Sequence, residues 1–144
     1  MQKRTHVDLS IIILSYNTSA FLRGCLASVF SSQTPDDTWE IIVVDNASTD
    51  GSADMVKNEF PSVRVIRNKK NIGFSAGNNV GIRQASGTYV LLLNSDTEVG
   101  AGTIVAMLSC MQSRPDAGAA TCRLVLPDGS LDPACHRGFP TPWA

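Results

Sequence analysis

Histidine is scarce in this sequence and its cysteines are scattered, which excludes several familiar kinds of site. The only histidines are His6 and His136, and none of the four cysteines form a Cys-x-x-Cys pair. Because zinc sites need clustered Cys and His ligands, a zinc site is not expected. A chain of 144 residues can build a core without disulfides. We therefore expect free thiols, mostly buried, in a reducing compartment.

Long apolar runs and basic clusters are also missing. The continuous apolar stretches, such as IIIL, are too short to span a bilayer. The polar start MQKRTHVDLS does not resemble a signal peptide, so a cytoplasmic location is expected. The formal net charge is −1, without a local Lys/Arg cluster, which argues against nucleic acid as a partner.

Glycine-rich phosphate loops are a third absence. The segment SYNTSAF, after the first predicted strand, contains no glycine, whereas a dinucleotide-binding turn needs several. No GxxxxGK[ST] sequence occurs either. Two common modes of nucleotide binding are therefore disfavoured, and an anion must be held by local geometry or by a metal.

Short β-branched runs alternate with amphipathic segments along the chain. Strands are predicted at 9–14, 40–44, 63–66, 89–93 and about 118–126. Helices are predicted from Thr18 or Ser19, from Ser52 to before Pro61, at about 75–85 and at about 101–112, with a hairpin turn over 126–131. The apolar face of the first helix is Phe21, Leu22, Cys25, Leu26, Val29 and Phe30. This alternation predicts an α/β three-layer sandwich with a mostly parallel, Rossmann-like sheet.

Residues that directly follow the strands are the candidate site, because parallel sheets bind ligands at the carboxyl ends of their strands. Asp45 can accept hydrogen bonds from a base N–H or from ribose, although its loop DNASTDGS is also turn-forming sequence. Asp50 is more simply explained as a cap of the next helix. In NIGFSAGNN, Gly73 and Gly77 permit close backbone approach to an anion, while Ser75 equally suits an ordinary cap.

An acid, Asp96, follows the fourth predicted strand in LLLNSD. Mg²⁺ and Mn²⁺ take oxygen ligands and are commonly shared between one or two carboxylates and substrate phosphates, which suits Asp96. Asn94 adds a neutral oxygen or a hydrogen-bond donor. Asn, Ser and Asp also form ordinary turns, so the triplet by itself is weak evidence for a metal site.

The four segments SYN, DNASTDGS, NxGFSAGNN and LLLNSD, in this order and spacing, resemble the inverting family 2 glycosyltransferases of the GT-A fold. The NSD form is most similar to a bacterial rhamnosyltransferase-type branch. The likeness runs from about Leu9 to Glu98 and is weaker to about residue 126. It implies a nucleotide-sugar-binding GT-A subdomain over 1–126 and the start of an incomplete acceptor-binding region over 127–144, in a truncated chain that holds the donor-binding part.

The resemblance also implies roles for individual residues. Asp96 would hold a divalent cation, Mg²⁺ or Mn²⁺, that bridges the donor diphosphate, and Asp45 would contact the base. The full set of implied donor-binding residues is Ser15, Tyr16, Asn17, Asp45, Asn46, Asn71, Gly73, Asn78, Asn79, Asn94 and Ser95. The family's Asp-x-Asp triplet reads Asn94-Ser95-Asp96 here, so its first carboxylate is missing and the metal site is less negative.

The expected activity is transfer of a sugar, such as rhamnose, from a dTDP- or UDP-sugar to a glycan or lipid-linked acceptor with inversion. The resemblance implies that the general base lies beyond residue 144, in the later half that such family members carry. The late acids Asp128 and Asp132 sit in turn-like sequence. A lipid-linked acceptor would bring the full protein to the inner face of the membrane, and exposed apolar surface would favour homo-oligomers. Two alternatives stay open. One is a non-catalytic nucleotide-sugar-binding or interaction domain of the same fold. The other is a receiver- or phosphatase-type domain, although such a domain needs an acid after its first strand and this chain has Asn17 there.

Overall fold

Four parallel strands form one sheet in the computed structural model, which describes residues 6–34, 36 and 38–135. The described strands are β1 (Leu9–Ser15), β2 (Trp39–Asp45), β3 (Arg64–Arg67) and β4 (Tyr89–Asn94), in the spatial order β3-β2-β1-β4. The chain divides into two units, residues 1–104 and 105–144, and the sheet lies in the first unit. The boundary at residue 126 proposed from the sequence stays a prediction.

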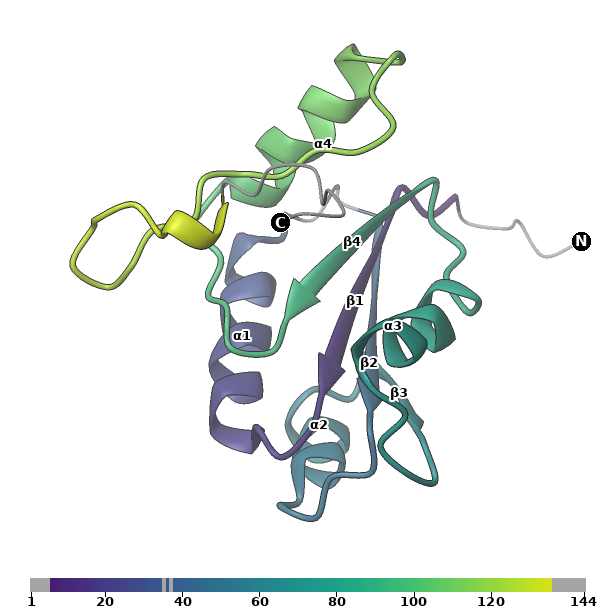
Figure 1. Ribbon diagram of the computed structural model, residues 1–144. Coiled ribbons are helices and arrows are strands. Elements are labelled where there is room, and N and C mark those ends of the chain that lie inside the picture. The colour runs from purple at the N-terminus through teal and green to yellow at the C-terminus, as the bar shows by residue number, and fades with distance from the viewer. Residues whose placement is uncertain (1–5, 35, 37, 136–144) are drawn as a thin grey trace, which may run out of the picture. The chain divides into compact units, whose positions relative to one another are not determined.

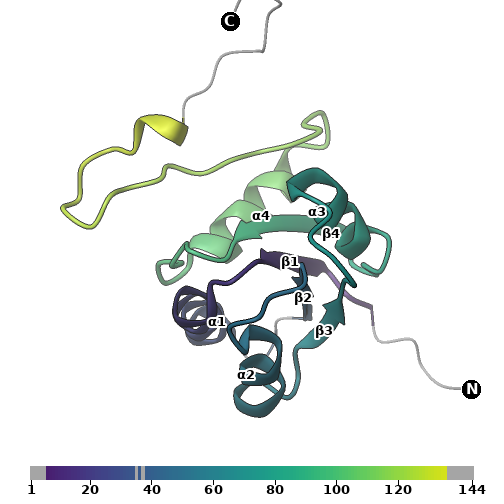
Figure 2. The ribbon, with the colours of Figure 1, turned by 60° about the horizontal axis from the view of Figure 1, so that its bottom comes forward.

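Helices cover both faces of the sheet in the first unit (Figures 1 and 2). Side chains of α1 (Ser19–Ser32) and α2 (Ser52–Glu59) pack against Ile11, Ile13 and Val43 on one face. On the other face, α3 (Phe74–Ile82) packs against Ile12 and Val44. Alternate residues of β1 and β2 thus enter two different cores, which explains their continuously apolar sequences. The expected three-layer α/β sandwich with a parallel sheet is confirmed.

Strand β4 differs from β1 and β2, because one of its faces is exposed. Leu91 and Leu93 pack on the α1 side, but Val90 and Leu92, on the opposite side, are 43% and 48% exposed. The physical reason is the placement of α3, which packs over β1 and β2. Side chains of β4 on that side of the sheet therefore lack the cover that Ile12 and Val44 receive.

The start of α1 also differs from expectation. The helix begins at Ser19 with Thr18 as its N-cap, but no side chain of the cap residue bonds the helix backbone. Along the helix, Leu22, Cys25, Leu26 and Val29 are buried as predicted. Phe21 is 65% exposed, so its assignment to the apolar face was wrong. It lies at the margin of that face, where the 3.6-residue period turns it toward solvent.

Two further described elements follow β4, and they lie in the second unit except for the first two residues of the helix. The helix predicted at about 101–112 is α4 (Thr103–Ser113), and Pro133–Cys135 form a short 3-10 helix. The predicted strand over 118–126 is wrong, because the segment pairs only with its own turn, through one antiparallel bridge between Val125 and Leu131. The turn itself is confirmed, with Gly129 N–H donating to Leu126 O at 2.8 Å. The end of the expected acceptor region, residues 136–144, lies outside the described residues.

The cysteines are free, as expected, but they are not mostly buried. Cys25 is buried in α1, whereas Cys110 is exposed and Cys122 and Cys135 are partly exposed. The last three lie in the second unit, whose described residues carry little buried apolar surface. Within the described part of the chain, no helix is long and apolar enough to cross a membrane.

A closed polar network occupies the amino-terminal edge of the sheet. Buried Ser10 donates to Glu40 Oε1 at 2.6 Å and accepts the Gly87 N–H at 2.8 Å. Ser86 donates to the same carboxylate through its backbone N–H and its hydroxyl. Burial raises the pKa of the Glu40 carboxyl, but the hydrogen bonds from Ser10 and Ser86 outweigh it and hold that pKa below its usual value.

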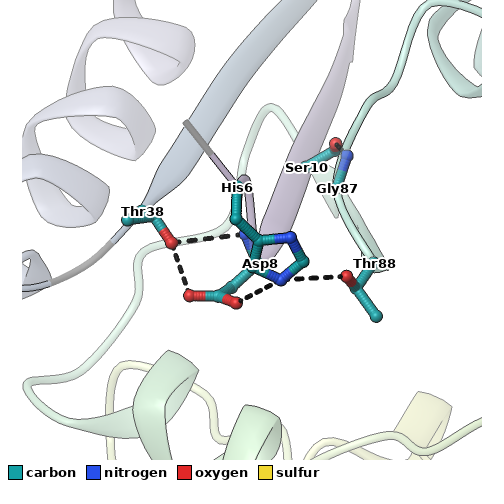
Figure 3. A network of polar contacts seen from close by, with 6 residues as sticks. All are labelled: His6, Asp8, Ser10, Thr38, Gly87 and Thr88. Atoms are coloured by element: carbon teal, nitrogen blue, oxygen red, sulfur yellow. Dashed lines mark hydrogen bonds and ion pairs between the residues drawn. The ribbon is translucent and has the colours of Figure 1, made fainter. Parts of the chain in front are cut away.

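Nearby surface residues extend this network (Figure 3). His6 Nε2 lies 3.0 Å from Asp8 Oδ1 and 3.4 Å from the hydroxyl of Thr88. Thr38 donates to the other oxygen of Asp8 and accepts the Asp8 backbone N–H at 3.3 Å. The loops before β1, β2 and β4 are joined in this way, so these side chains are explained by their mutual contacts.

Candidate functional site

Two cavities open among the loops at the carboxyl ends of the strands. The first, of about 310 Å³, is lined by Asp45, Ala47, Ser48, Thr49, Gly51, Ala53, Asp54, Arg67 and Asn68. The second, of about 390 Å³, is lined by Leu14, Tyr16, Thr18, Asn46, Asn71, Gly73, Phe74, Asn94, Ser95 and Asp96. Their location agrees with the rule that parallel sheets bind ligands at this edge.

Asp45 ends β2 and carries a carboxylate that the protein does not satisfy. The residue is 3% exposed, and among the described residues Oδ2 accepts the Ser48 N–H alone, at 3.3 Å. Oδ1 is buried and has no hydrogen-bond partner among the described residues. Because buried polar atoms are nearly always bonded, this oxygen is open to a donor from a water molecule or a ligand. Asp45 is one of the residues that line the first cavity.

The loop after β2 is held by the loop after β1. Asn17 Oδ1 accepts the Thr49 N–H at 2.8 Å, and the Asn17 N–H donates to Ser48 Oγ at 3.0 Å. Asn17 adopts a positive φ of 54° to make these contacts, and Ala47 has one of 66°. Positive φ is uncommon outside glycine and is tolerated best by Asn. Asn17 is therefore not a lining residue of the first cavity, but it holds two residues, Ser48 and Thr49, that are.

Asp50 joins the starts of two helices. Its Oδ2 accepts the Ser19 N–H of α1 at 2.8 Å, and its Oδ1 accepts the Ser52 N–H of α2 at 3.0 Å and the Ser52 hydroxyl. Burial raises the pKa of this carboxyl, but the hydrogen bonds from Ser52 and Ser19 outweigh it and lower the pKa. The N-cap position of α2 belongs to Gly51 and not to Asp50, which lies one residue earlier and bonds the first N–H of the helix. The bond to α1 is an addition that sequence spacing did not indicate.

Asn46 fixes the loop that leads into α3. It is 2% exposed, donates to Asn71 Oδ1 at 2.8 Å and accepts from Asn68 Nδ2 at 3.0 Å and the Ile72 N–H at 3.2 Å. Asn71 Oδ1 also accepts the Gly73 N–H at 2.9 Å, where Gly73 adopts a φ of 85°. The second cavity is bordered by this loop, so Asn46 and Asn71 set its shape.

The turn after β4 supplies the polar side of the second cavity. Asn94 and Asp96 are exposed, and among the described residues none bonds or pairs with the Asp96 carboxylate. Among the described residues, no group of three or more His, Cys, Asp or Glu residues converges on a point. One carboxylate beside an amide oxygen does fit a cation that takes its other ligands from a diphosphate and water.

The negative charge of this turn affects a thiol in α1, the helix that packs next to it. Burial, together with the negative charges of Asp96 and Glu98, raises the pKa of the Cys25 thiol to about 12. The thiol also lies 3.5 Å from Asn94 O. Cys25 is therefore an inert packing residue.

Four of the residues implied by the resemblance lie outside both cavities. These are Ser15, which is buried and bonded to Thr18, together with Asn17, Asn78 and Asn79. Asn78 is buried in α3, where it donates to Phe74 O at 3.1 Å. Gly77 was expected to admit an anion, but a side chain there would lie 2.5 Å from Leu14 Cδ1. The lack of a side chain at Gly77 lets α3 approach the sheet closely.

Sequence reasoning missed part of the first cavity wall. Ser48, Thr49 and Asp54 line it, as do Arg67 and Asn68 directly after β3. Arg67 pairs there with Asp54. The rule about carboxyl ends of strands already pointed to the loop from Arg67, so that rule could have identified Arg67 and Asn68. Asp54, inside α2, gave no such signal.

Comparison with known proteins agrees with this geometry. The sequence model described as Glycosyl transferase family 2 matches residues 10–136, nearly the whole chain. The chain belongs to this family. A poly(ribitol-phosphate) beta-glucosyltransferase of Bacillus spizizenii is 35% identical over 103 residues, which are 69% of this chain and 16% of that protein. An N-acetylglucosaminyl-diphospho-decaprenol L-rhamnosyltransferase of Mycobacterium tuberculosis is 27% identical over 140 residues, 90% of this chain and 45% of that protein.

Solved structures share the fold of this family 2 chain. TarS 1–349 of S. aureus, crystallised in complex with UDP-GlcNAc, superposes with a TM-score of 0.69 at 25% identity, over 76% of this chain and 32% of that one. The mannosyltransferase PcManGT of Pyrobaculum calidifontis, in complex with GDP-Man and Mn²⁺, gives 0.67 at 23% identity, over 75% and 33%. The GT-A fold is confirmed. The chain spans 14% to 52% of the length of eight curated relatives that it matches.

Proposed function

We propose that this chain binds a nucleoside-diphosphate sugar and a divalent cation as the donor-binding part of a family 2 glycosyltransferase. The observation that carries the proposal is Asp45, which lines the first cavity and has a buried, unpartnered Oδ1, together with a second cavity bordered by Asp96. A base N–H would satisfy Asp45. The ribose and diphosphate would then extend along Asn46 and Asn71 toward Asp96.

The two carboxylates have divided roles in this proposal. Asp96, with Asn94, would hold Mg²⁺ or Mn²⁺, which when bound neutralises charge on the leaving diphosphate. Tyr16 and Gly73 would border the donor in the second cavity. A general base for an inverting transfer is not assigned: Asp128 Oδ1 accepts the Ser130 N–H at 2.9 Å within its turn, which explains that residue structurally.

The proposal extends to the sugar, the acceptor and the location of the full protein. Rhamnose as the sugar, from a dTDP-sugar, is supported by the NSD form of the turn and by the rhamnosyltransferase among the relatives. A UDP-sugar is the other donor, in view of the glucosyltransferase relative. We propose a glycan or lipid-linked acceptor, which would place the full protein at the inner face of the membrane, and homo-oligomers formed through exposed residues such as Leu92.

Titration calorimetry with UDP and dTDP, with and without Mn²⁺, tests the proposed function. Asp96→Ala should abolish the Mn²⁺-dependent gain in nucleotide affinity and leave the fold intact, since its side chain is exposed. Asp45→Ala should weaken nucleotide binding with or without metal. Wild-type affinity in Asp96→Ala would exclude the metal assignment, and failure of both nucleotides to bind wild type would exclude the donor site.

The neutral Asn94 favours one second candidate, a non-catalytic nucleotide-sugar-binding domain, because it removes a carboxylate from the metal turn. Hydrolysis or transfer of a bound donor sugar separates the two. Binding without turnover by the full-length protein, and turnover restored by Asn94→Asp, would support the non-catalytic domain.

A further inference from the structure

Thr18 occupies the N-cap position of α1 without capping the helix. Threonine at this position ordinarily accepts a hydrogen bond from the helix backbone. Here its Oγ1 lies 2.9 Å from Ser15 Oγ and donates to Ser95 Oγ at 3.1 Å. The hydroxyl thus links the end of β1 to the turn after β4, across 77 residues of sequence.

Capping of α1 is supplied from elsewhere. Asp50, in the loop after β2, accepts the Ser19 N–H at 2.8 Å. The Thr18 hydroxyl is therefore not needed to accept the Ser19 N–H, although its N-cap position predicts a bond to the helix backbone. Two partners of that hydroxyl, Ser15 and Ser95, are both buried, so each depends on protein contacts for its hydrogen bonds.

Ser95 stands between the two residues that face the proposed cation. The turn closes with the Thr97 N–H donating to Asn94 O at 3.2 Å, and Cys25 Sγ lies 3.5 Å from the same carbonyl. Asp96 itself has no protein partner among the described residues. The direction of its carboxylate therefore depends on how the backbone of Ser95 is anchored, and the described side-chain anchor of Ser95 is Thr18.

We propose that Thr18 is a positioning residue for the metal-holding turn Asn94–Asp96. Its hydroxyl, held between Ser15 and Ser95, fixes the turn so that the Asp96 carboxylate enters the second cavity. This inference rests on the proposed function, because it assumes that Asp96 holds a divalent cation. The role is indirect: Thr18 orients the residue that binds the ion, as outer-shell partners of metal ligands do.

The test uses three variants of the chain and two measurements. Thr18→Val removes the hydroxyl at nearly constant shape, Thr18→Ser keeps it, and Thr88→Val removes a threonine hydroxyl at the opposite edge of the sheet. Mn²⁺ binding is followed by the loss of the free-ion electron paramagnetic resonance signal in the presence of UDP. Hydrogen–deuterium exchange of a peptide covering 94–97 reports the turn directly.

Thr18→Val should weaken Mn²⁺ binding by about 10-fold, the lower end of losses seen for outer-shell partners, and should speed exchange at 94–97. Thr18→Ser and Thr88→Val should match wild type in both. A Thr18→Val variant equal to wild type in both measurements overturns this inference while the donor site stands. A wild-type chain that binds no Mn²⁺ overturns the cation assignment and the role of Thr18 with it.

Discussion

The two edges of the sheet are built from similar residues and differ in whether those residues are satisfied. At the amino-terminal edge, the Glu40 carboxylate accepts bonds from Ser10 and Ser86, and Asp8 bonds Thr38 and His6 (Figure 3). At the carboxyl-terminal edge, one oxygen of Asp45 is buried without a partner. Both edges carry carboxylates and hydroxyls, so composition alone does not distinguish them.

The difference indicates where a ligand belongs. A polar group whose bonds are complete within the protein is explained by folding, whereas an incomplete one costs stability unless something else binds it. Backbone strain follows the same division, since Asn17 and Ala47, the non-glycine residues described with positive φ, both lie at the carboxyl-terminal edge. Strain of this kind gathers at functional sites.

The largest expected effect is at the satisfied edge. In Gly87→Ala, the new Cβ would lie 2.6 Å from Ser10 N and 2.8 Å from Leu9 C, and these backbone atoms cannot turn aside as a side chain can. We expect a loss of about 3 kcal/mol in the free energy of unfolding, seen by thermal denaturation as a fall in Tm of roughly 10 °C.

Gly118→Ala is the matched control, because nothing lies within 4 Å of a Cβ at that position. Its Tm should stay within about 2 °C of wild type, in line with surface substitutions elsewhere. UDP affinity should be unchanged in both variants below their transitions. A Gly87→Ala variant as stable as wild type would show that the amino-terminal edge is looser than its contacts indicate.

A pair of Asp→Asn substitutions in one loop should change stability in opposite directions. Asp45→Asn removes a charge from a buried site with an unpartnered oxygen, so the free energy of unfolding should rise by about 1 kcal/mol. Asp50→Asn turns one acceptor of the Ser19 or Ser52 N–H into a donor, so stability should fall by about 1–2 kcal/mol. Denaturant titration measures both.

Nucleotide affinity completes the comparison. Asp45→Asn should bind UDP or dTDP about 10-fold more weakly, since a hydrogen bond to a charged group contributes roughly 1.5–3 kcal/mol. If Asp45→Asn instead lowered the free energy of unfolding, as Asp50→Asn should, the Asp45 carboxylate would have its hydrogen bonds within the protein and would not need a ligand.

The place of Asp45 and Asp96 near the carboxyl ends of their strands could be predicted from the sequence, whereas the closed network at the amino-terminal edge could not. Asp45 and Asp96 were located because a strand's last residue is visible in its apolar run, and parallel strands end together. The roles of Asn17 and Asp50 could not be read in the same way, because their partners Thr49 and Ser19 lie about thirty residues away and spacing rules cover only local contacts. The exposure of Val90 likewise depends on which strands α3 covers, which apolar sequence does not specify.

The smallest expected effect tests whether the carboxyl-terminal edge is strained. Ala47 has a φ of 66°, in a region that costs a residue with a Cβ roughly 1–2 kcal/mol and costs glycine little. Glycine also loses about 0.5–1 kcal/mol more through its freedom in the unfolded chain, so Ala47→Gly should gain about 0.5 kcal/mol by denaturant titration. Ala27→Gly, in the middle of α1, should instead lose about 1 kcal/mol. If both variants lost stability equally, the loop after β2 would hold no strain to release, and the contrast between the two edges would rest on the hydrogen bonds alone.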